Sequence, residues 1–327
     1  LEVRRLHERL FSRPLLTASA RLSNTEARLT PEAARERLAA LGFRDPAGAM
    51  RHLEALTVGL SRRAAIQRTL LPVMLGWFAD EADPDAGLLS FRRISESLGA
   101  SHWYLRMLRD EGSAAERLAH ILARSRYAAD LLTSAPESVA ILGDIGGLAP
   151  RGREAILATM RSAIGRKAKP DDAITAARVV RRQELFRIAV ADLSGVLDLS
   201  GVGAALTDLT SATLQSALDI AIRGVEADLS TPLGTRLLVV GMGSLGGAEM
   251  GYGSDADVMF VHQADEGVDE TDAQKQATSV VQEVLRLLGL AGPDPQMIVD
   301  PDLRPEGKAG PQVRPPAGDG SRSEQDT

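Results

Sequence analysis

The sequence has no cysteine and only 3% aromatic residues, and it has no long apolar run. The absence of cysteine excludes disulfides, thiolate zinc sites and cysteine nucleophiles. No apolar stretch approaches the roughly 20 residues that a helix needs to span a bilayer. We therefore expect a cytoplasmic protein without a membrane partner, whose chemistry depends on oxygen and nitrogen groups.

Lysine is also scarce, with four lysines among 38 basic residues. This arginine- and alanine-rich composition is typical of a GC-rich genome rather than of a nucleic-acid surface, and the net charge of −6 agrees, so no nucleic-acid partner is expected. At 327 residues the chain is long enough for a packed core and favours more than one domain. Because it opens with Leu1 rather than Met, we expect a fragment of a longer protein.

Residues 26–230 have the apolar spacing of successive helices. Proline-led helix starts follow Thr30, Asp45, Ala135 and Lys169, because proline is tolerated in the first turn, and at Thr30 a hydroxyl also occupies the N-cap position. No fixed-period repeat is visible, which argues against a solenoid. The sequence predicts a helical bundle for this region.

The pattern changes near residue 231. Short apolar runs at 236–240, 255–262 and 297–303 predict strands, and residues 271–290 predict an amphipathic helix with Thr271 as its N-cap. The fold class we expect is α+β: a mainly helical bundle followed by a small α/β domain at 231–313. Residues 314–327 lack apolar periodicity and are expected to be a disordered tail.

A glycine-rich motif, GMGSLG, follows the first predicted strand at 241–246. Its form matches G-x-G-x-x-G and so raises the possibility of a dinucleotide site. That site requires a long helix directly after the glycines, whereas Gly247, Gly251 and Gly253 interrupt the next residues. We therefore favour a different interpretation, in which the loop acts together with the acids that follow it.

Asp255 and Asp257 are two residues apart on a predicted strand, so their carboxylates lie on one face. Adjacent carboxylates repel unless a cation lies between them, and oxygen ligands favour Mg²⁺. Asp300 would be the third carboxylate, with Asp302 in reserve, while the Gly243-Ser244 loop would hold phosphates. The competing interpretation is that these are solvated acids at the edge of a strand.

The stretches LLVVGMGSLGGAEMGYGSDADVMFVH and IVDPDLRPEGKAGP resemble the nucleotidyltransferase signature of the glutamine synthetase adenylyltransferase family. The GYGSD form resembles the second, adenylylating copy of that motif more than the first. The helical stretch LGFRDPAGAMRHLEAL is similar to the region joining the family's two halves, and the opening residues 1–25 resemble the end of the first half. The resemblance implies a polymerase-β-like nucleotidyltransferase fold, present as an incomplete core at 231–313.

The resemblance further implies transfer of AMP from ATP to a tyrosine of glutamine synthetase, and in the intact enzyme its removal by phosphorolysis. Asp255, Asp257 and Asp300 would then bind Mg²⁺, with Asp300 as general base. Gly243 and Ser244 would hold phosphate, and Arg304 and Lys308 would steady the triphosphate or the pyrophosphate. Glutamine and the PII signalling protein are the implied effector and partner.

Two other interpretations stay open. The chain could be a catalytically inert module that binds glutamine synthetase or PII, or a nucleotidyltransferase acting on another protein or a small molecule. The five histidines have no metal-binding spacing, and His262 is expected to be a polar residue at the end of its strand.

Overall fold

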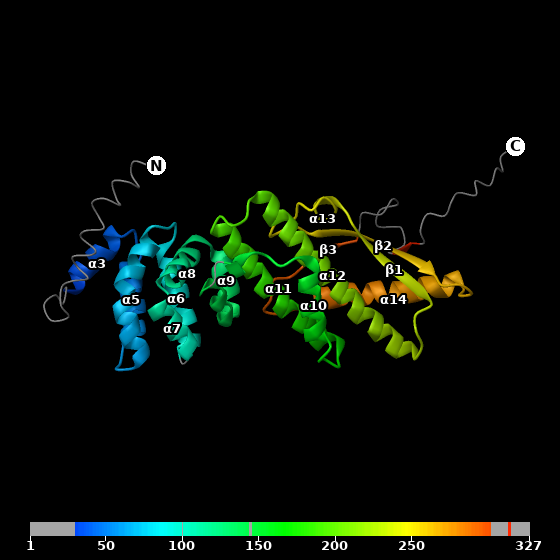
Figure 1. Ribbon diagram of the computed structural model, residues 1–327, viewed down its shortest axis with the longest axis horizontal. Coiled ribbons are helices and arrows are strands. Elements are labelled where there is room, and N and C mark those ends of the chain that lie inside the picture. Colours follow the sequence, from blue (N-terminus) through cyan, green and yellow to red (C-terminus); the bar gives the residue numbers. More distant parts are fainter. Residues whose placement is uncertain (1–29, 100, 144–145, 302–312, 315–327) are drawn as a thin grey trace. The chain divides into compact units, whose positions relative to one another are not determined.

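The computed structural model describes residues 30–99, 101–143, 146–301 and 313–314 of the chain. The chain forms two compact units, Leu1–Gly147 and Leu148–Thr327, and each is described by itself (Figure 1). The domain division at residue 230 that the composition favoured stays a prediction. None of the described helices is long and apolar enough to cross a membrane.

The first unit is helical in all of its described elements. These are α3 (Pro31–Ala40), α4 (Pro46–Thr57), α5 (Arg62–Ala79), α6 (Pro84–Leu98), α7 (His102–Asp110), α8 (Gly112–Arg124), α9 (Arg126–Ser134) and the 3-10 helices η1 (Pro136–Gly143) and η2 (Gly146–Leu148), the last reaching the boundary. The helix starts expected after Thr30 and Asp45 are confirmed, since both side chains accept an N-cap hydrogen bond, at 3.3 and 2.8 Å. The start expected after Ala135 is wrong in type, because η1 is a 3-10 helix.

Aromatic residues hold the core of the first unit. The rings of Phe78 and Phe91 pack with centroids 6.3 Å apart, and the buried Tyr104 hydroxyl hydrogen-bonds with Ser95 Oγ at 2.9 Å. Helix α6 approaches its neighbours closely at Gly87, where an added Cβ would lie 2.7 Å from the Cβ of Ala123. Phe78, Phe91 and Tyr104 therefore contribute to packing here.

The second unit has three long helices before its sheet. Its elements are α10 (Arg153–Ile164), α11 (Pro170–Leu193), α12 (Leu199–Leu229), β1 (Thr235–Gly241), α13 (Gly243–Gly246), β2 (Ala256–Ala264), α14 (Glu270–Gly289), β3 (Val299–Asp300) and β4 (Val313–Arg314). The predicted strands at 236–240 and 255–262 and the predicted helix at 271–290 are confirmed to within two residues. Asp269, not Thr271, is the N-cap of α14, because its carboxylate accepts from the backbone N–H groups of Thr271 and Asp272.

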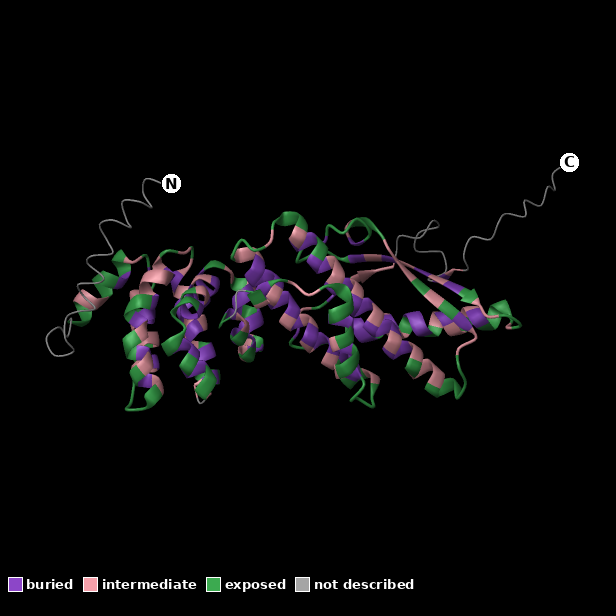
Figure 2. Cartoon of the chain, in the orientation of Figure 1, coloured by how far each residue is buried: buried purple, intermediate pink, exposed green. Residues whose placement is uncertain are grey.

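β2 is the central strand of a mixed sheet. The whole length of β1 pairs antiparallel with one edge of β2, while β3 and β4 pair parallel with the other edge. Side chains alternate along β2, and the buried set, Ala256, Val258, Phe260 and His262, faces inward. Helix α14 contacts this sheet and also packs on α12, and Figure 2 shows buried residues where they meet. The fold is α+β, as expected.

Candidate functional site

The glycine loop, residues 241–254, connects β1 to β2 and turns sharply at its start. The backbone N–H of Met242 donates to the carbonyl of Asp257 at 2.8 Å, which closes the turn. A Cβ on Gly246 would lie 2.7 Å from the carbonyl oxygen of Gly241, so the turn leaves no room for a side chain there. Between β1 and β2 the described helix is α13, which ends after four residues at Gly246. The long helix that a dinucleotide site requires does not follow these glycines.

Gly243 brings the loop backbone against the carboxylate of Asp257. Its φ is +51°, in the left-handed region that favours glycine. A Cβ built on Gly243 would lie 2.4 Å from Oδ2 of Asp257. Two of the predicted site residues, one from the loop and one from β2, are therefore in direct proximity.

The β2–β3 ladder places a second carboxylate beside Asp257. Asp257 and Asp300 are direct partners in the parallel pairing, and both are half-buried. Partners in a ladder project to the same face of the sheet. Asp255 is exposed and immediately precedes β2, two residues before Asp257. The structure thus brings Asp257, Asp300 and Gly243 together, with Asp255 at the entrance of the strand.

The described residues do not contain a preformed cluster of three or more acidic, histidine or cysteine side chains arranged to hold a metal ion. Asp302, Arg304 and Lys308 lie outside the described residues. The three-carboxylate site and the phosphate roles of Arg304 and Lys308 consequently stay predictions. The supporting geometry is limited to the Asp257–Asp300 pair and the loop at Gly243.

A small cavity of about 100 Å³ lies beside Asp255. Its walls are residues 250–255, residues 296–298 and side chains of α11 and α12. Ligand pockets commonly measure about 300–1,000 Å³, so this cavity cannot enclose a nucleotide.

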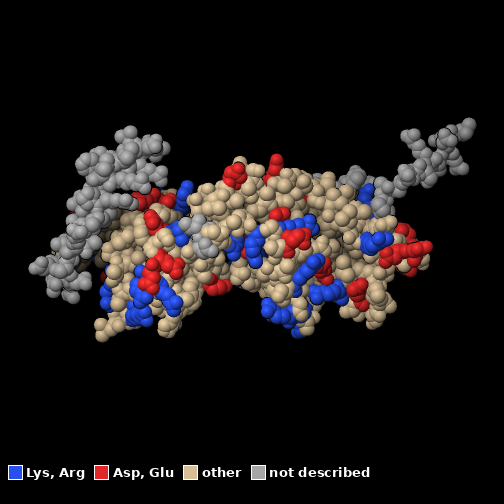
Figure 3. All heavy atoms as spheres, viewed as in Figure 1, with Lys and Arg blue, Asp and Glu red and all other residues tan. Residues whose placement is uncertain are grey.

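A second group of acidic residues lies away from the candidate carboxylates. Glu266, Asp269, Glu270 and Asp272 are exposed around the β2–α14 turn, where acidic side chains gather in Figure 3. This turn follows the C-terminal end of β2, whereas Asp257 is at the N-terminal end of the same strand. These four acids therefore form a solvated surface, distinct from the candidate carboxylates.

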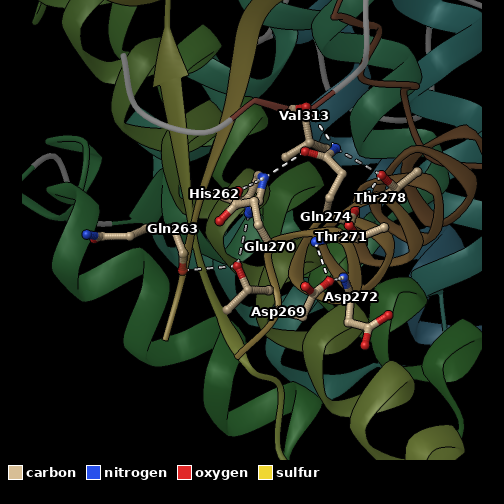
Figure 4. A network of polar contacts seen from close by, with 10 residues as sticks. His262, Gln263, Asp269, Glu270, Thr271, Asp272, Gln274, Thr278 and Val313 are labelled. Carbon is tan, nitrogen blue, oxygen red and sulfur yellow. Dashed lines mark hydrogen bonds and ion pairs between the residues drawn. The ribbon is translucent and has the colours of Figure 1, made fainter. Parts of the chain in front are cut away.

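His262, expected to be a polar residue at the end of its strand, lies two residues before the end of β2 and is 1% exposed inside a hydrogen-bonded network (Figure 4). Its Nδ1 contacts Thr235 Oγ1 at 3.2 Å and its Nε2 contacts Gln274 Oε1 at 2.7 Å. Gln274 also donates to the carbonyl of Val313 at 3.0 Å. The network joins β1, β2, β4 and α14, so His262 stabilises the sheet rather than the candidate chemistry.

Helices α11 and α12 support the loops of the candidate site. A Cβ on Gly203 of α12 would lie 3.1 Å from the carbonyl oxygen of Ala248 in the glycine loop. The hydroxyl of Tyr252 donates to Asp192 of α11 at 3.1 Å. These supporting residues were not identified from the sequence. The sequence signals for them were weak: a glycine within α12 and an acidic residue near the end of α11.

Comparison with known proteins identifies the family. A sequence model of glutamate-ammonia ligase adenylyltransferase matches residues 115–318. The bifunctional glutamine synthetase adenylyltransferase/adenylyl-removing enzyme of Streptomyces avermitilis is 56% identical over 331 residues, covering 95% of this chain and 33% of that protein. The Streptomyces coelicolor and Nocardia farcinica proteins of the same name are 55% and 46% identical, covering 95% and 96% of this chain and 32% of each relative.

The chain therefore spans about a third of the length of the curated relatives that it matches. The family match includes the end of the first unit, the helices α10–α12 and the sheet with its glycine loop. The candidate carboxylates Asp255, Asp257 and Asp300 all lie within the matched residues. The chain belongs to the glutamate-ammonia ligase adenylyltransferase family.

Proposed function

We propose that the second unit carries a nucleotidyltransferase site that transfers AMP from ATP to a tyrosine hydroxyl of glutamine synthetase. The observation that carries the proposal is the ladder pairing of Asp257 with Asp300 directly beside the backbone of Gly243. The names of the relatives, which act on glutamine synthetase, support the choice of target. Within this proposal the fold of the site is that of a polymerase-β-like nucleotidyltransferase.

The donor set fits a magnesium ion. Carboxylate oxygens are the ligands that Mg²⁺ prefers, and Asp257 and Asp300 project from neighbouring strands to one face. Because residue 243 has no Cβ, its backbone lies against the Asp257 carboxylate without a steric clash. Asp255, Asp257 and Asp300 would hold Mg²⁺, which when bound would neutralise charge on the reacting phosphates.

The remaining steps belong to the residues of the chain. The backbone at Gly243 and the hydroxyl of Ser244 bind the triphosphate of ATP, since a glycine loop permits close approach to phosphate. Asp300 accepts the proton of the tyrosine hydroxyl while the tyrosine oxygen attacks the α-phosphorus of ATP. The bond between the α-phosphorus and the bridging oxygen breaks, and pyrophosphate leaves. Arg304 and Lys308, outside the described residues, would steady the pyrophosphate.

The proposal extends to the regulatory setting. The relatives' printed name includes removal of the adenylyl group, and phosphorolysis of the AMP–tyrosine bond would use the same kind of site. Glutamine as effector and the PII protein as partner complete the proposed control of nitrogen assimilation, in the cytoplasm.

Transfer of labelled AMP from ATP to purified glutamine synthetase, with Mg²⁺ present, tests the proposal. The parent chain is compared with Asp257→Asn and with Asp265→Asn, a matched control on the same unit, whose carboxylate pairs with the exposed Arg236. We expect labelling by the parent and by Asp265→Asn, and none by Asp257→Asn. Absence of labelling by a folded parent would refute catalysis by this chain and favour the inert binding module. Equal labelling by all three would place the site elsewhere.

A further inference from the structure

Three arginines on one face of α11 hold the segment that leads from α14 into β3. Arg178 donates through Nη1 to the carbonyl of Leu290 at 2.6 Å and through Nη2 to that of Leu288 at 2.7 Å. Arg181 donates to the carbonyl of Pro295 at 2.7 Å. Residues 178, 181 and 182 share one helix face because their spacing is three and four.

The third arginine forms a buried ion pair. Arg182 Nη1 lies 2.5 Å from Asp294 Oδ1, and the two side chains are 9% and 4% exposed. Two charges are removed from water together only where the geometry repays their desolvation, and the pair then strongly restricts the relative position of the two segments. Arg178 adds to this restriction because the carbonyls at a helix C-terminus have no intrahelical partner and it supplies one.

The held segment, residues 288–295, continues directly into β3. The backbone N–H of Ala256 donates to the carbonyl of Ile298 at 2.8 Å, after which Ala256 pairs with Val299 and Asp257 with Asp300. β3 has two residues, so its own ladder supplies few hydrogen bonds to specify register. A slip of one residue would turn the Asp300 side chain to the opposite face of the sheet.

We propose that Arg178, Arg181, Arg182 and Asp294 are positioning residues that fix the register of β3 and so keep Asp300 beside Asp257. The catalytic consequence of this register rests on the proposed function, in which Asp300 is a metal ligand and the general base. The positional part, that contacts with α11 fix the register of β3, does not rest on the proposed function. The two parts of the inference can therefore be separated by experiment.

The test uses the double variant Arg182→Met/Asp294→Leu in the full chain. Replacing both members of a buried pair by apolar residues of similar size commonly preserves folding, whereas removing one leaves an uncompensated charge. Arg236→Ala/Asp265→Ala, which removes an exposed pair from the same unit, is the matched control. Arg181→Met is a milder second variant, because Arg181 is only half-buried.

Amide hydrogen exchange at residues 298–300 reads the register without any assay of activity. We expect exchange there to accelerate by about tenfold in the double variant, less in Arg181→Met, and to be unchanged in the control. AMP transfer should show a fall in kcat of about tenfold or more with the KM for ATP held within about threefold, because the glycine loop is not part of the held segment.

Parent-like exchange at residues 298–300 in both the double variant and Arg181→Met would overturn the proposal. Faster exchange with a kcat equal to that of the parent would overturn its catalytic part. If the parent transfers no AMP, the proposed function fails, yet the exchange measurement still decides whether α11 sets the register of β3.

Discussion

Substitution of Gly243 by alanine tests the contact between the glycine loop and Asp257 most directly. The alanine Cβ would lie 2.4 Å from Oδ2 of Asp257 and 3.4 Å from its Cγ. The residue would also have to keep a φ of +51°, which favours glycine. The substitution therefore combines backbone strain with displacement of one carboxylate, the group to which the proposal assigns a metal ion.

The two effects differ in size. A side chain in the left-handed region costs about 1–2 kcal/mol of folding free energy. Relief of the overlap requires the carboxylate to move by about 1 Å to reach an ordinary contact distance, with a rotamer cost of about 1 kcal/mol. The free energy of unfolding should thus fall by about 2–3 kcal/mol. A displacement of about 1 Å in a catalytic group can reduce the rate by about 100-fold, and we expect a loss of that order.

Two other glycines separate strain from displacement. Gly267 has a φ of +82° and no atom within 4 Å of an added Cβ, so Gly267→Ala carries strain alone. Gly253, in the glycine loop, has open space and no positive φ, so Gly253→Ala carries neither effect. Urea denaturation measures stability, and Mn²⁺ affinity and labelled AMP transfer measure the site. Activity and Mn²⁺ affinity of Gly243→Ala equal to those of Gly267→Ala would refute the reasoning.

Three further substitutions test other parts of the structure. Gln274→Leu leaves the His262 ring and the carbonyl of Val313 without their buried hydrogen-bond partner. The free energy of unfolding, measured by urea denaturation, should therefore fall by about 2 kcal/mol, whereas Lys275→Ala at an exposed position should change it hardly at all. Hydrogen bonds from Arg126 and the α6 backbone lower the pKa of Asp83. The ionised carboxylate therefore stabilises the folded state above about pH 4, and this stabilisation is lost as the pH falls further. In Asp83→Asn the midpoint of urea unfolding should depend less steeply on pH in the acid range. Gly203→Ala would press on the glycine loop and should raise the KM for ATP, as initial rates of AMP transfer would show.

Local sequence signals predicted most of the elements because the stabilising interactions are themselves local. The carboxylate of Asp45 and the hydroxyl of Thr30 cap helices whose first residues they immediately precede. The alternation along β2 matches a strand with one buried face. The N-cap of α14 was misplaced by two residues because Asp269 and Thr271 are both good caps, and only the backbone path decides which carboxylate or hydroxyl is used.

The candidate site was accessible to sequence reasoning only in part. Strand periodicity alone predicts that Asp255 and Asp257 lie on one face. The pairing of Asp257 with Asp300 depends in addition on the topology of the sheet, in which β3 lies beside β2 although α14 comes between them in the sequence. The burial of His262 was missed because a histidine at the end of a strand is usually solvated, and its partners Thr235 and Gln274 come from distant elements. Long-range hydrogen bonds of this kind leave no periodic signal.

Helices α11 and α12 are part of the candidate site and not only a connection to it. Gly203 limits the distance between α12 and the glycine loop, and Asp192 of α11 accepts from Tyr252 of the same loop. The arginines of α11 hold the other segment, the one that delivers Asp300. Both loops that converge on Asp257 therefore depend on one helical pair, and these helices belong to the same compact unit, which begins at Leu148. Any change that shifts α11 along its axis would move the two loops together, so the chemistry of the site and the packing of these helices should respond to the same substitutions.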